Sequence, residues 1–511
     1  METDKITSSY RVSLGEDQIV VDVTMNSDGE GDISKILSNC ANAYVDEVEM
    51  LNGEAHYMGG VVFDLLYVDE TGASRILSEK VDLNGRIQND QINPFMKPVY
   101  KIDTVNTKVL SADGGSVKVI ATVGIKLDAV QTDEVEEVRV NDDNIQLCRE
   151  HTQTNMVVAS GTKTFEINEV FDTKMDIKNV LCAKAHVDLK DADDGTGYFS
   201  VSGNLFVNAL LDVQTGDELC MKNFMETIAF KEELEDEQIQ KGDNVLAFAF
   251  VRPQDLSIMT SKSDDGNEKD CSISVKAVVT VKYVVQRACD AEVYTDAFSM
   301  KNKTNIVSGT FMTSKPQKIE KFSATIDGQT VIDENEPRIA KICAVANEHL
   351  LVANTRLNEG ELTVEGVAYA TVIYQTDDDV PQYNSVDLEI PFANKFDVDG
   401  EFCGNIFVTG DVTDVDTKVK KGKEINITLD VCFLAYSYDT DNQVIIKDIE
   451  LAEELPESEY SIEMYIAPKG STAWDVSKHL LVTEDVLTAQ NPELVFPLER
   501  SQTVVHFNQR G

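Results

Sequence analysis

The phrase Cys40-Ala41-Asn42-Ala43 is found again, with its third residue changed, as Cys182-Ala183-Lys184-Ala185 and Cys343-Ala344-Val345-Ala346. After each copy comes a glycine that opens an apolar run, and a bulky residue closes the run eight positions later. The three runs are Gly59–Tyr67, Gly203–Leu211 and Gly366–Tyr374. The spacing from cysteine to glycine is 19, 21 and 23 residues. This recurrence indicates one structural unit present in three copies.

Two further markers follow in the same order in each copy. The first is a short phrase that ends in phenylalanine: Ile92–Phe95, Ile228–Phe230 and Ile390–Phe392. The second is a strand-like segment: Ser116–Val119, Ser274–Ala277 and Ile425–Thr428. The period of about 140 to 160 residues is the size of a domain and too long for a solenoid repeat. We therefore expect tandem domains.

Strand patterns dominate these copies. Apolar residues alternate at Ile273, Val275, Ala277 and Val279, which is the period of a strand with one buried face. Glycine-containing turns separate such runs, and we interpret them as hairpins: Asp113–Gly115, Asp264–Asn267 and Lys421–Lys423. The best helical signal is short and runs into the cysteine phrase, as in Asp176–Leu181. The predicted fold class is mainly β, with three tandem antiparallel β-sandwich-like domains.

Domain boundaries follow from a second repeated phrase. Thr154–Val157 and Thr304–Val307 each lead into Ser-Gly-Thr, and the chain becomes polar after both. Leu455-Pro456 then precedes a tail with a different pattern. The predicted domains are 1–165 with N-terminal strands, 166–312, 313–455, and a small domain at 456–511.

Net charge limits the classes of partner. The 511 residues include 45 Lys and Arg against 90 Asp and Glu, so the formal charge is −45. Such a charge repels phosphate backbones and anionic membranes, which argues against nucleic-acid binding. The acidic residues form a solvated surface or, as the alternative, a face that docks a basic partner.

Targeting signals and cysteine usage bear on the compartment. The first residues lack an apolar core of signal-peptide length, and no run of about 18 apolar residues is present that could insert as a transmembrane helix. Nine cysteines are scattered without a CxxC pair. This usage predicts a reducing, cytoplasmic location, and we expect the cysteines of the repeated phrase to pack in the core.

Motifs for catalysis are missing from the sequence. The six histidines lack zinc-site spacing, and no nucleophile elbow, phosphate loop or dinucleotide fingerprint is found. Asp191–Gly195 is similar to the start of a calcium loop, but the closing glutamate is missing, so we interpret it as a hairpin turn. The sequence predicts no catalytic residues, metal or cofactor, and favours a binding protein over an enzyme.

The tail predicts the order strand, helix, helix, strand. Ile462–Ile466 alternates as a strand, and Ser471 or Thr472 can cap a helix that carries Trp474. A second helix follows Thr483 and ends at Asn491-Pro492. The last strand is Thr503–Phe507.

These residues, Met464–Ser477 with Val486-Leu487 and Asn491-Pro492, resemble a LysM domain. Ser471 stands where that family has Asp, Ala473 where it has Leu, and Ser501 where it has Gly. The resemblance implies a partner- or glycan-binding groove between two loops. Its residues are Lys469, Gly470, Ser471, Thr472, Trp474, Asn491, Pro492 and Phe496. The alternative for Trp474 is that it fills the core of the small domain.

Taken together, three β-rich repeats and one LysM-like tail resemble the SipL-like family of spore-coat morphogenetic proteins, whose repeats are called SPOCS domains. The resemblance implies a non-enzymatic scaffold in the mother-cell cytoplasm, around the forespore surface. It also implies that the spore-coat morphogenetic ATPase of the basement layer is the partner, bound in part by the LysM domain. The alternative is that the tail binds peptidoglycan, a polymer containing N-acetylglucosamine. A wall hydrolase would require a catalytic domain, and every large segment is assigned to a repeat.

Overall fold

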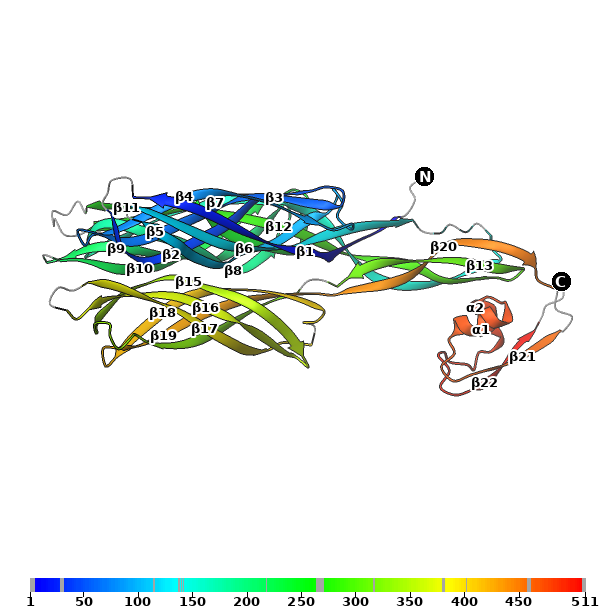
Figure 1. The fold of residues 1–511 in the computed structure, drawn as a ribbon. Helices are drawn as coiled ribbons and strands as arrows, with labels where there is room; N and C mark the ends of the chain where they lie inside the picture. Colours follow the sequence, from blue (N-terminus) through cyan, green and yellow to red (C-terminus); the bar gives the residue numbers. More distant parts are fainter. Residues whose placement is uncertain are drawn as a thin grey trace.

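The structure is a computed structural model, and long antiparallel strands make up most of it (Figure 1). It describes residues 5–27, 32–113, 115–136, 138, 140, 142–216, 218–262, 271–315, 318–378, 382–400, 402–456 and 461–507. Two short helices lie near the C-terminal end of the described chain. The mainly β fold class is therefore confirmed.

The first unit consists of two antiparallel sheets of three strands, ordered β1-β6-β5 and β2-β3-β4. Apolar residues alternate on the middle strands, so that Val61, Phe63 and Leu65 of one sheet face Val117 and Val119 of the other. Each such buried side chain contributes about 1.5–3 kcal/mol. The strand bounds are β1 Lys5–Asn26, β2 Ile33–Met50, β3 Glu54–Asp69, β4 Ser74–Gln88, β5 Lys97–Asp113 and β6 Ser116–Glu136.

The second unit repeats this arrangement with the orders β11-β12-β7 and β10-β9-β8. Leu205, Val207 and Ala209 of β9 point into a core of its own. Its strand bounds are β7 Ile145–Thr173, β8 Asp176–Asp194, β9 Tyr198–Thr215, β10 Glu218–Glu235, β11 Asn244–Lys262 and β12 Cys271–Ser299.

The third unit has the orders β14-β19-β18 and β15-β16-β17 around a third core. Two further strands, β13 and β20, pair with each other and flank the unit in the chain. The bounds are β13 Asn302–Ser314, β14 Lys318–Val331, β15 Ile339–Asn358, β16 Glu361–Thr376, β17 Tyr383–Asp397, β18 Asn405–Lys420, β19 Glu424–Tyr438 and β20 Thr440–Glu454.

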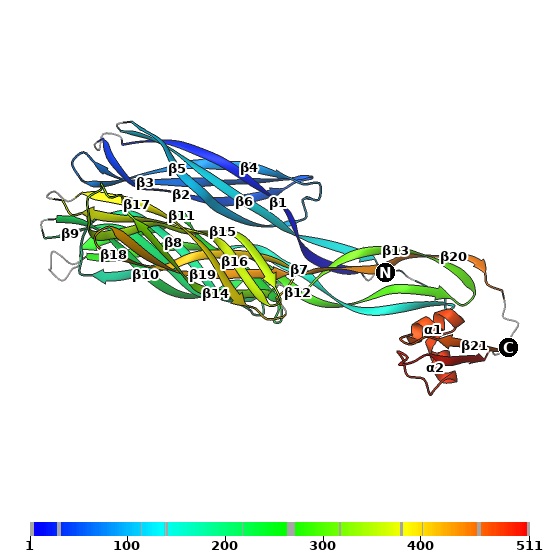
Figure 2. The ribbon, with the colours of Figure 1, turned by 60° about the horizontal axis from the view of Figure 1, so that its bottom comes forward.

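A stalk extends from the three units toward the C-terminal domain (Figures 1 and 2). It is formed by the outer halves of β1, β6, β7 and β12 together with β13 and β20. Residues from all three units meet in its small apolar cluster, namely Ile6, Val135, Val293, Phe311 and Ile445. The stalk thus joins the units at a second place, away from their cores.

The C-terminal domain contains β21 (Ile462–Ala467), α1 (Ala473–Leu480), α2 (Glu484–Gln490) and β22 (Gln502–Phe507) in chain order. β21 and β22 pair antiparallel. Val476, Leu487 and Val504 belong to a core that is separate from the three larger ones. That this is a LysM domain stays a prediction.

Several local predictions of secondary structure can be compared directly with the observed strands. Asp176–Leu181 is not helical, because it begins β8, whose pairing with β9 overrides a weak local preference. The hairpin interpretations of Asp191–Gly195 and Lys421–Lys423 are confirmed, since the β8-β9 and β18-β19 pairs turn there. Gly114 and the turn at 264–267 lie outside the described residues. The boundaries at 165 and 312 stay predictions, and these residues lie within β7 and β13.

Candidate functional site

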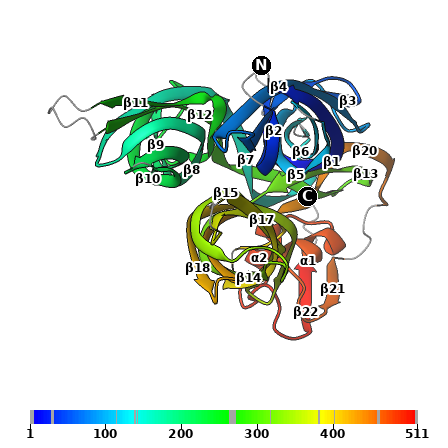
Figure 3. The ribbon, with the colours of Figure 1, turned by 60° about the vertical axis from the view of Figure 1, so that its left-hand side comes forward.

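The three units lie side by side around a common centre (Figure 3), and the strands that carry the cysteine phrases line it. These strands are β2, β8 and β15. Each has one face in the core of its own unit and the other toward the neighbouring units. We therefore treat this centre and the C-terminal domain as the two candidate sites.

The glycine marker is structurally equivalent in all three units. A Cβ atom on Gly59, Gly203 or Gly366 would overlap a carbonyl oxygen of the neighbouring strand, that of Tyr44, Asp188 or Leu351. The close approach explains why glycine is required there. The bulky residues that close the three runs, Tyr67, Leu211 and Tyr374, are all fully buried.

The three marker cysteines do not occupy equivalent positions in their units, so aligning the copies on cysteine was wrong. Cys40 pairs with Asp64, five residues after Gly59, whereas Cys182 pairs with Leu210, seven residues after Gly203. Cys343 is left unpaired at a β-bulge. The register break beside the phrase is at the same structural place in all three units, at Leu37, Leu181 and Cys343. The cysteine lies three residues after this break in the first unit, one residue after it in the second and on it in the third.

The phenylalanine marker holds in two units and fails in the first. Phe230 and Phe392 pair with Gly203 and Gly366. Leu83 pairs with Gly59, and Phe95 instead lies exposed in a loop. The true counterpart in the first unit is therefore Leu83.

An apolar group of side chains lies at the centre and is here called the interface cluster. The cysteines of the repeated phrase were expected to pack in the core, but this cluster lies between the units. Leu66, Leu210 and Ile373 each lie seven residues after the marker glycine and meet there. The other buried members are Leu37, Leu181, Met221 and Ala344, with Cys182 and Cys343 packed against them. Equivalent residues of the three units thus form one shared hydrophobic contact.

The thiols at this centre are poorly suited to reaction. Burial raises the pKa of Cys182 to about 12 and that of Cys343 to about 11, and it raises the pKa of Cys40 well above its ordinary value. A thiol with a raised pKa forms little thiolate at neutral pH, and the thiolate is the reactive form. Cys182 and Cys343 pack between the units, and Cys40 Sγ lies 3.9 Å from Asp64 Oδ2 within the first unit.

Polar contacts surround the interface cluster. The Asn223 side chain and the backbone of Val345 exchange two hydrogen bonds of 3.1 and 3.0 Å between the second and third units. Ser74 Oγ of the first unit donates to Asp212 Oδ1 of the second at 2.8 Å. The Ser74–Asp212 bond is buried and the Asn223–Val345 pair is part-buried, and such bonds fix how the units sit against one another.

In the C-terminal domain, Trp474 contacts the stalk. Its Nε1 donates to Asp296 Oδ2 at 2.8 Å, and its ring centroid lies 5.1 Å from that of Phe298. Lys478 Nζ lies 2.7 and 2.6 Å from the two Asp296 oxygens. We call this set of residues the stalk contact. Trp474 is not among the residues of the domain's own core.

The pKa of Asp296 reflects this contact. Burial acts to raise the pKa, but the hydrogen bonds from Lys478 and Trp474 outweigh it and lower the pKa below its ordinary value. Asp296 is therefore ionised at neutral pH and pairs with the charged lysine.

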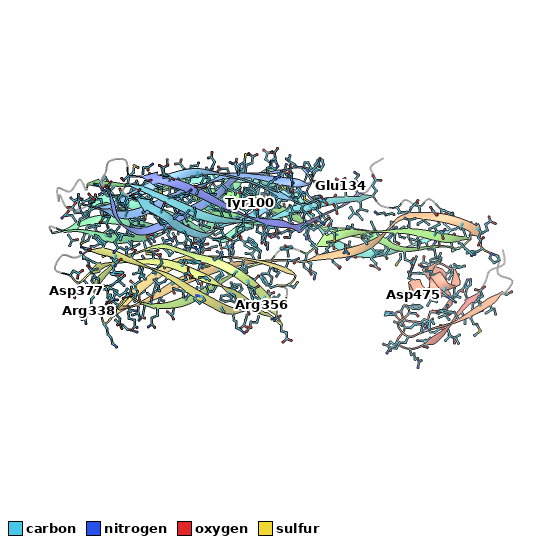
Figure 4. The ribbon with its side chains drawn as sticks, in the orientation of Figure 1. Tyr100, Glu134, Arg338, Arg356, Asp377 and Asp475 are labelled. Atoms are coloured by element: carbon cyan, nitrogen blue, oxygen red, sulfur yellow. The ribbon has the colours of Figure 1, made fainter. Side chains whose placement is uncertain are left out.

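The first predicted groove loop is held by backbone contacts. Gly470 N donates to Leu498 O at 2.7 Å, and Leu498 N donates to Ser471 O at 3.0 Å. Thr472 caps α1 in a capping box with Asp475, the residue labelled in the C-terminal domain in Figure 4, and Lys469 is exposed. This loop therefore lies beside Leu498, a residue two positions beyond the end of the second predicted loop.

The second predicted loop is built around a buried amide. Asn491 Nδ2 donates to the carbonyl oxygens of Leu487 and Val505, and its Oδ1 accepts from Val505 N. Pro492 is exposed, and Phe496 is half-buried against the domain core. Asn491 therefore holds α2 to β22, and its polar groups are occupied within the chain.

An exposed apolar row on β21 was not identified from the sequence. Ile462, Met464 and Ile466 are 53%, 70% and 71% exposed. The alternation of the segment was visible, but its period does not say which face the helices cover. The structure places the apolar residues on the uncovered face.

Metal and membrane motifs are not found in the described part of the chain. Those residues contain no group of three or more His, Cys, Asp or Glu placed to hold a metal ion. Across the same residues, neither helix has the length and apolar character needed to cross a membrane.

Comparison with known families gives one result. Residues 338–420 match the family described as SipL, SPOCS domain. The matched stretch runs from the start of β15 to the end of β18, and covers the whole β15-β16-β17 sheet and only β18 of the other sheet of the third unit. No curated protein and no solved structure matches the chain.

Proposed function

We propose that this chain is a non-enzymatic scaffold in the assembly of the endospore coat. The observation that carries the proposal is the similarity of residues 338–420 to the SipL SPOCS domain. The first two units have the sheet orders of the third, so the proposal extends the SPOCS assignment to them.

The architecture supports scaffolding in physical terms. Three units share one interface cluster, and a separate small domain sits on the stalk. A rigid body with an appended domain can present several modest contacts on one chain, which raises overall avidity without one strong site. We place this scaffold in the mother-cell cytoplasm, around the forespore surface.

The spore-coat morphogenetic ATPase is the proposed partner, bound in part by the C-terminal domain. The exposed row Ile462, Met464 and Ile466 supports this assignment, because a contiguous exposed apolar face often marks an interaction surface. The three residues of the row are not part of the core of the C-terminal domain. They can therefore be substituted without removing a core side chain, so the row can be tested.

The test is a pull-down of the ATPase by the full chain and by a variant with Met464→Glu and Ile466→Glu. Charges on the row are expected to reduce retention at least about tenfold, because carboxylates would be desolvated in the contact. Val331→Glu, at a residue 62% exposed on β14, is the control. Equal retention by the row variant and the control would contradict binding through this face. A fluorescent fusion that fails to encircle the forespore would contradict the scaffold itself.

Peptidoglycan binding is the second candidate. The proximity of the loop at 469–472 to Leu498 favours it, because a LysM groove lies between two such loops. The engagement of Trp474 and Asn491 inside the chain argues against it. Sedimentation with purified peptidoglycan decides between them: saturable binding that Lys469→Ala weakens would favour the glycan.

A further inference from the structure

A cavity of about 590 Å³ lies between the first and second units. Its wall comes mainly from β2 and β5 of the first unit and from β7, β8, β11 and β12 of the second. Three exposed residues of the first unit, Asp46, Glu47 and Lys97, belong to this wall, so the cavity is open to the surface. The volume is in the range of sites that take small organic molecules.

The side chain of Lys282 lies in this cavity, on the outer face of β12. Its neighbours Val281 and Tyr283 are buried in the core of the second unit, and alternation along a strand turns the residue between them to the opposite face. There Lys282 Nζ donates a hydrogen bond to Oη of Tyr100 in the first unit, the residue labelled in Figure 4. The ring centroid of Phe250 lies 5.7 Å from Nζ. The amine is therefore half-buried beside aromatic groups where two units meet.

No carboxylate forms an ion pair with Lys282 in the part of the chain that the structure describes, where its hydrogen-bond partner is the neutral Tyr100. Asp46 acts on the Lys282 charge from β2, but its carboxylate is paired with another cation, since Oδ1 lies 2.9 Å from Arg252 Nη1. Arg252 Nε also lies 2.6 Å from Asp255 Oδ2. The amine thus lacks a counter-ion that would hold it in the protonated form.

A break in β11 brings Arg252 to this place. The pairing of β11 with β12 passes from Val251 to Leu256, so residues 252–255 leave the ladder. The strands β5 and β18 pair in the same way with the middle strands of their sheets, and they skip only one residue at a time. The longer break in the second unit carries Arg252 to Asp46 of the first. Breaks of this kind re-aim side chains, often beside functional sites.

The surroundings make Lys282 less basic than an ordinary lysine. Its pKa is lowered to about 8: burial is the largest cause, Asp46 acts against it, and Arg252 adds to it. At neutral pH a larger share of this amine is therefore unprotonated than in a lysine with the usual pKa of about 10.4. An unprotonated lysine in an apolar cavity beside a second cation is the arrangement that favours imine formation with carbonyl compounds.

We propose that Lys282 Nζ is a carbonyl-capture site, which forms an imine with a small aldehyde that has an aromatic or apolar body. The Nζ lone pair adds to the carbonyl carbon, and a proton passes from nitrogen to the carbonyl oxygen. The hydroxyl group then leaves as water while the C=N bond forms, so the step consumes no oxidant or reductant. Phe248, Phe250 and Leu256 supply the apolar wall for the body of the aldehyde. The site is independent of the proposed scaffold function, because it lies between the first two units and away from the C-terminal domain.

The test treats the full chain at neutral pH with benzaldehyde and sodium cyanoborohydride, which reduces the imine to a stable secondary amine. Peptide mass spectrometry then locates the adducts. Lys282 is expected to be labelled at least about tenfold faster than Lys97, which lines the same cavity but is exposed, because more of the Lys282 amine is unprotonated. Equal labelling of the two lysines would overturn the site.

Glyoxylate, a small charged aldehyde without an apolar body, serves as the comparison probe. The ratio of Lys282 to Lys97 labelling should be lower with glyoxylate than with benzaldehyde, because a carboxylate gains nothing from the apolar wall. An equal ratio for the two aldehydes would overturn the assignment to an apolar body.

Variants connect the reactivity to the wall of the cavity. Arg252→Gln removes the second cation and frees Asp46 to pair with Lys282, so labelling of Lys282 is expected to slow at least about threefold. Arg356→Gln, which removes an exposed ion pair with Glu365 in the third unit, is the matched control. Lys282→Arg keeps the charge and should abolish the fast labelling, with circular dichroism as the check on folding. An unchanged rate in Arg252→Gln, or fast labelling that persists in Lys282→Arg, would overturn the proposal.

Discussion

The contact among the three units and the contact between the C-terminal domain and the stalk rest on different chemistry. The interface cluster buries Leu66, Leu210 and Ile373, which are 3% exposed or less. The stalk contact consists of one carboxylate, Asp296, with Trp474 and Lys478, and of the Trp474 ring against Phe298; its lysine is 43% exposed. Apolar burial is stable across salt and pH, whereas an exposed ion pair is weak and screened.

This difference suggests a division of labour between the two regions. The three units are expected to unfold as one body, because separating them would expose apolar surface from every unit. The C-terminal domain has its own core and can leave the stalk at small cost. Under the proposed scaffold function, the three-unit body would stay rigid while the C-terminal domain is free to leave the stalk.

The largest expected effect is from Leu210→Ala in the interface cluster. Removing a buried leucine side chain is expected to lower the free energy of unfolding by about 2–5 kcal/mol, because apolar burial is lost and a cavity remains. Guanidinium denaturation followed by far-UV circular dichroism measures it. Val331→Ala, at an exposed residue, should change stability by less than about 0.5 kcal/mol. An equal effect of the two substitutions would contradict the shared interface.

The next effect is from Gly203→Ala at the equivalent glycine. The added Cβ would overlap Asp188 O, so the β8-β9 pair must separate, and a loss of about 1–3 kcal/mol is expected in the same denaturation experiment. Gly400→Ala is the matched control, since a Cβ there meets nothing within 4 Å. The account of the repeat would be wrong if Gly203→Ala were as stable as this control.

A smaller effect is expected from Asp296→Ala in the stalk contact. Docking should weaken by about 1–2 kcal/mol, because one hydrogen bond from Trp474 and two from the half-exposed Lys478 to a charged group are removed. Trp474 is the one tryptophan of the sequence, so its emission maximum and acrylamide quenching report docking directly. Asp416→Ala, which removes an exposed ion pair with Lys418 on β18, is the control. Fluorescence that stays unchanged in Asp296→Ala would show that the contact is not formed.

The smallest effect is the pH dependence of docking. The pKa of Asp296 is lowered in the docked state, so its contribution is fully present above the ordinary aspartate value of about 4 and is lost as pH falls through the lowered pKa. Trp474 quenching should therefore stay constant from neutral pH to about 4 and rise below it. The Asp296→Asn variant should lack this transition. An identical acid transition in both chains would assign it to other carboxylates.

Sequence reasoning located the repeats through glycine and misaligned them through cysteine. A glycine forced by a backbone contact stays at one structural position, as Gly59, Gly203 and Gly366 do. Cysteine tolerates many half-buried places, and the three cysteines lie at different distances from the equivalent register breaks at Leu37, Leu181 and Cys343. The mainly β class followed from alternation alone.

The candidate sites were less accessible from sequence. Alternation shows two faces of a strand but not that the second face of β9 meets other units, so the interface cluster could not be predicted. Lys282 is one of the 45 Lys and Arg residues of the chain, and the cavity beside it forms only where two units meet. Trp474 was predicted as a groove residue or as core filler, and its contact with Asp296 joins residues 178 positions apart.

The measurement that bears most directly on the account follows two signals in one urea titration of the wild-type chain, Leu210→Ala and Asp296→Ala. Circular dichroism reports the strands of the body, and Trp474 fluorescence reports the stalk contact. We predict that Leu210→Ala lowers the circular dichroism midpoint and leaves native Trp474 exposure unchanged. Asp296→Ala should leave the circular dichroism midpoint unchanged and increase native Trp474 exposure. If each substitution moved both signals together, the body and the C-terminal domain would be one cooperative structure, and the division between them would be wrong.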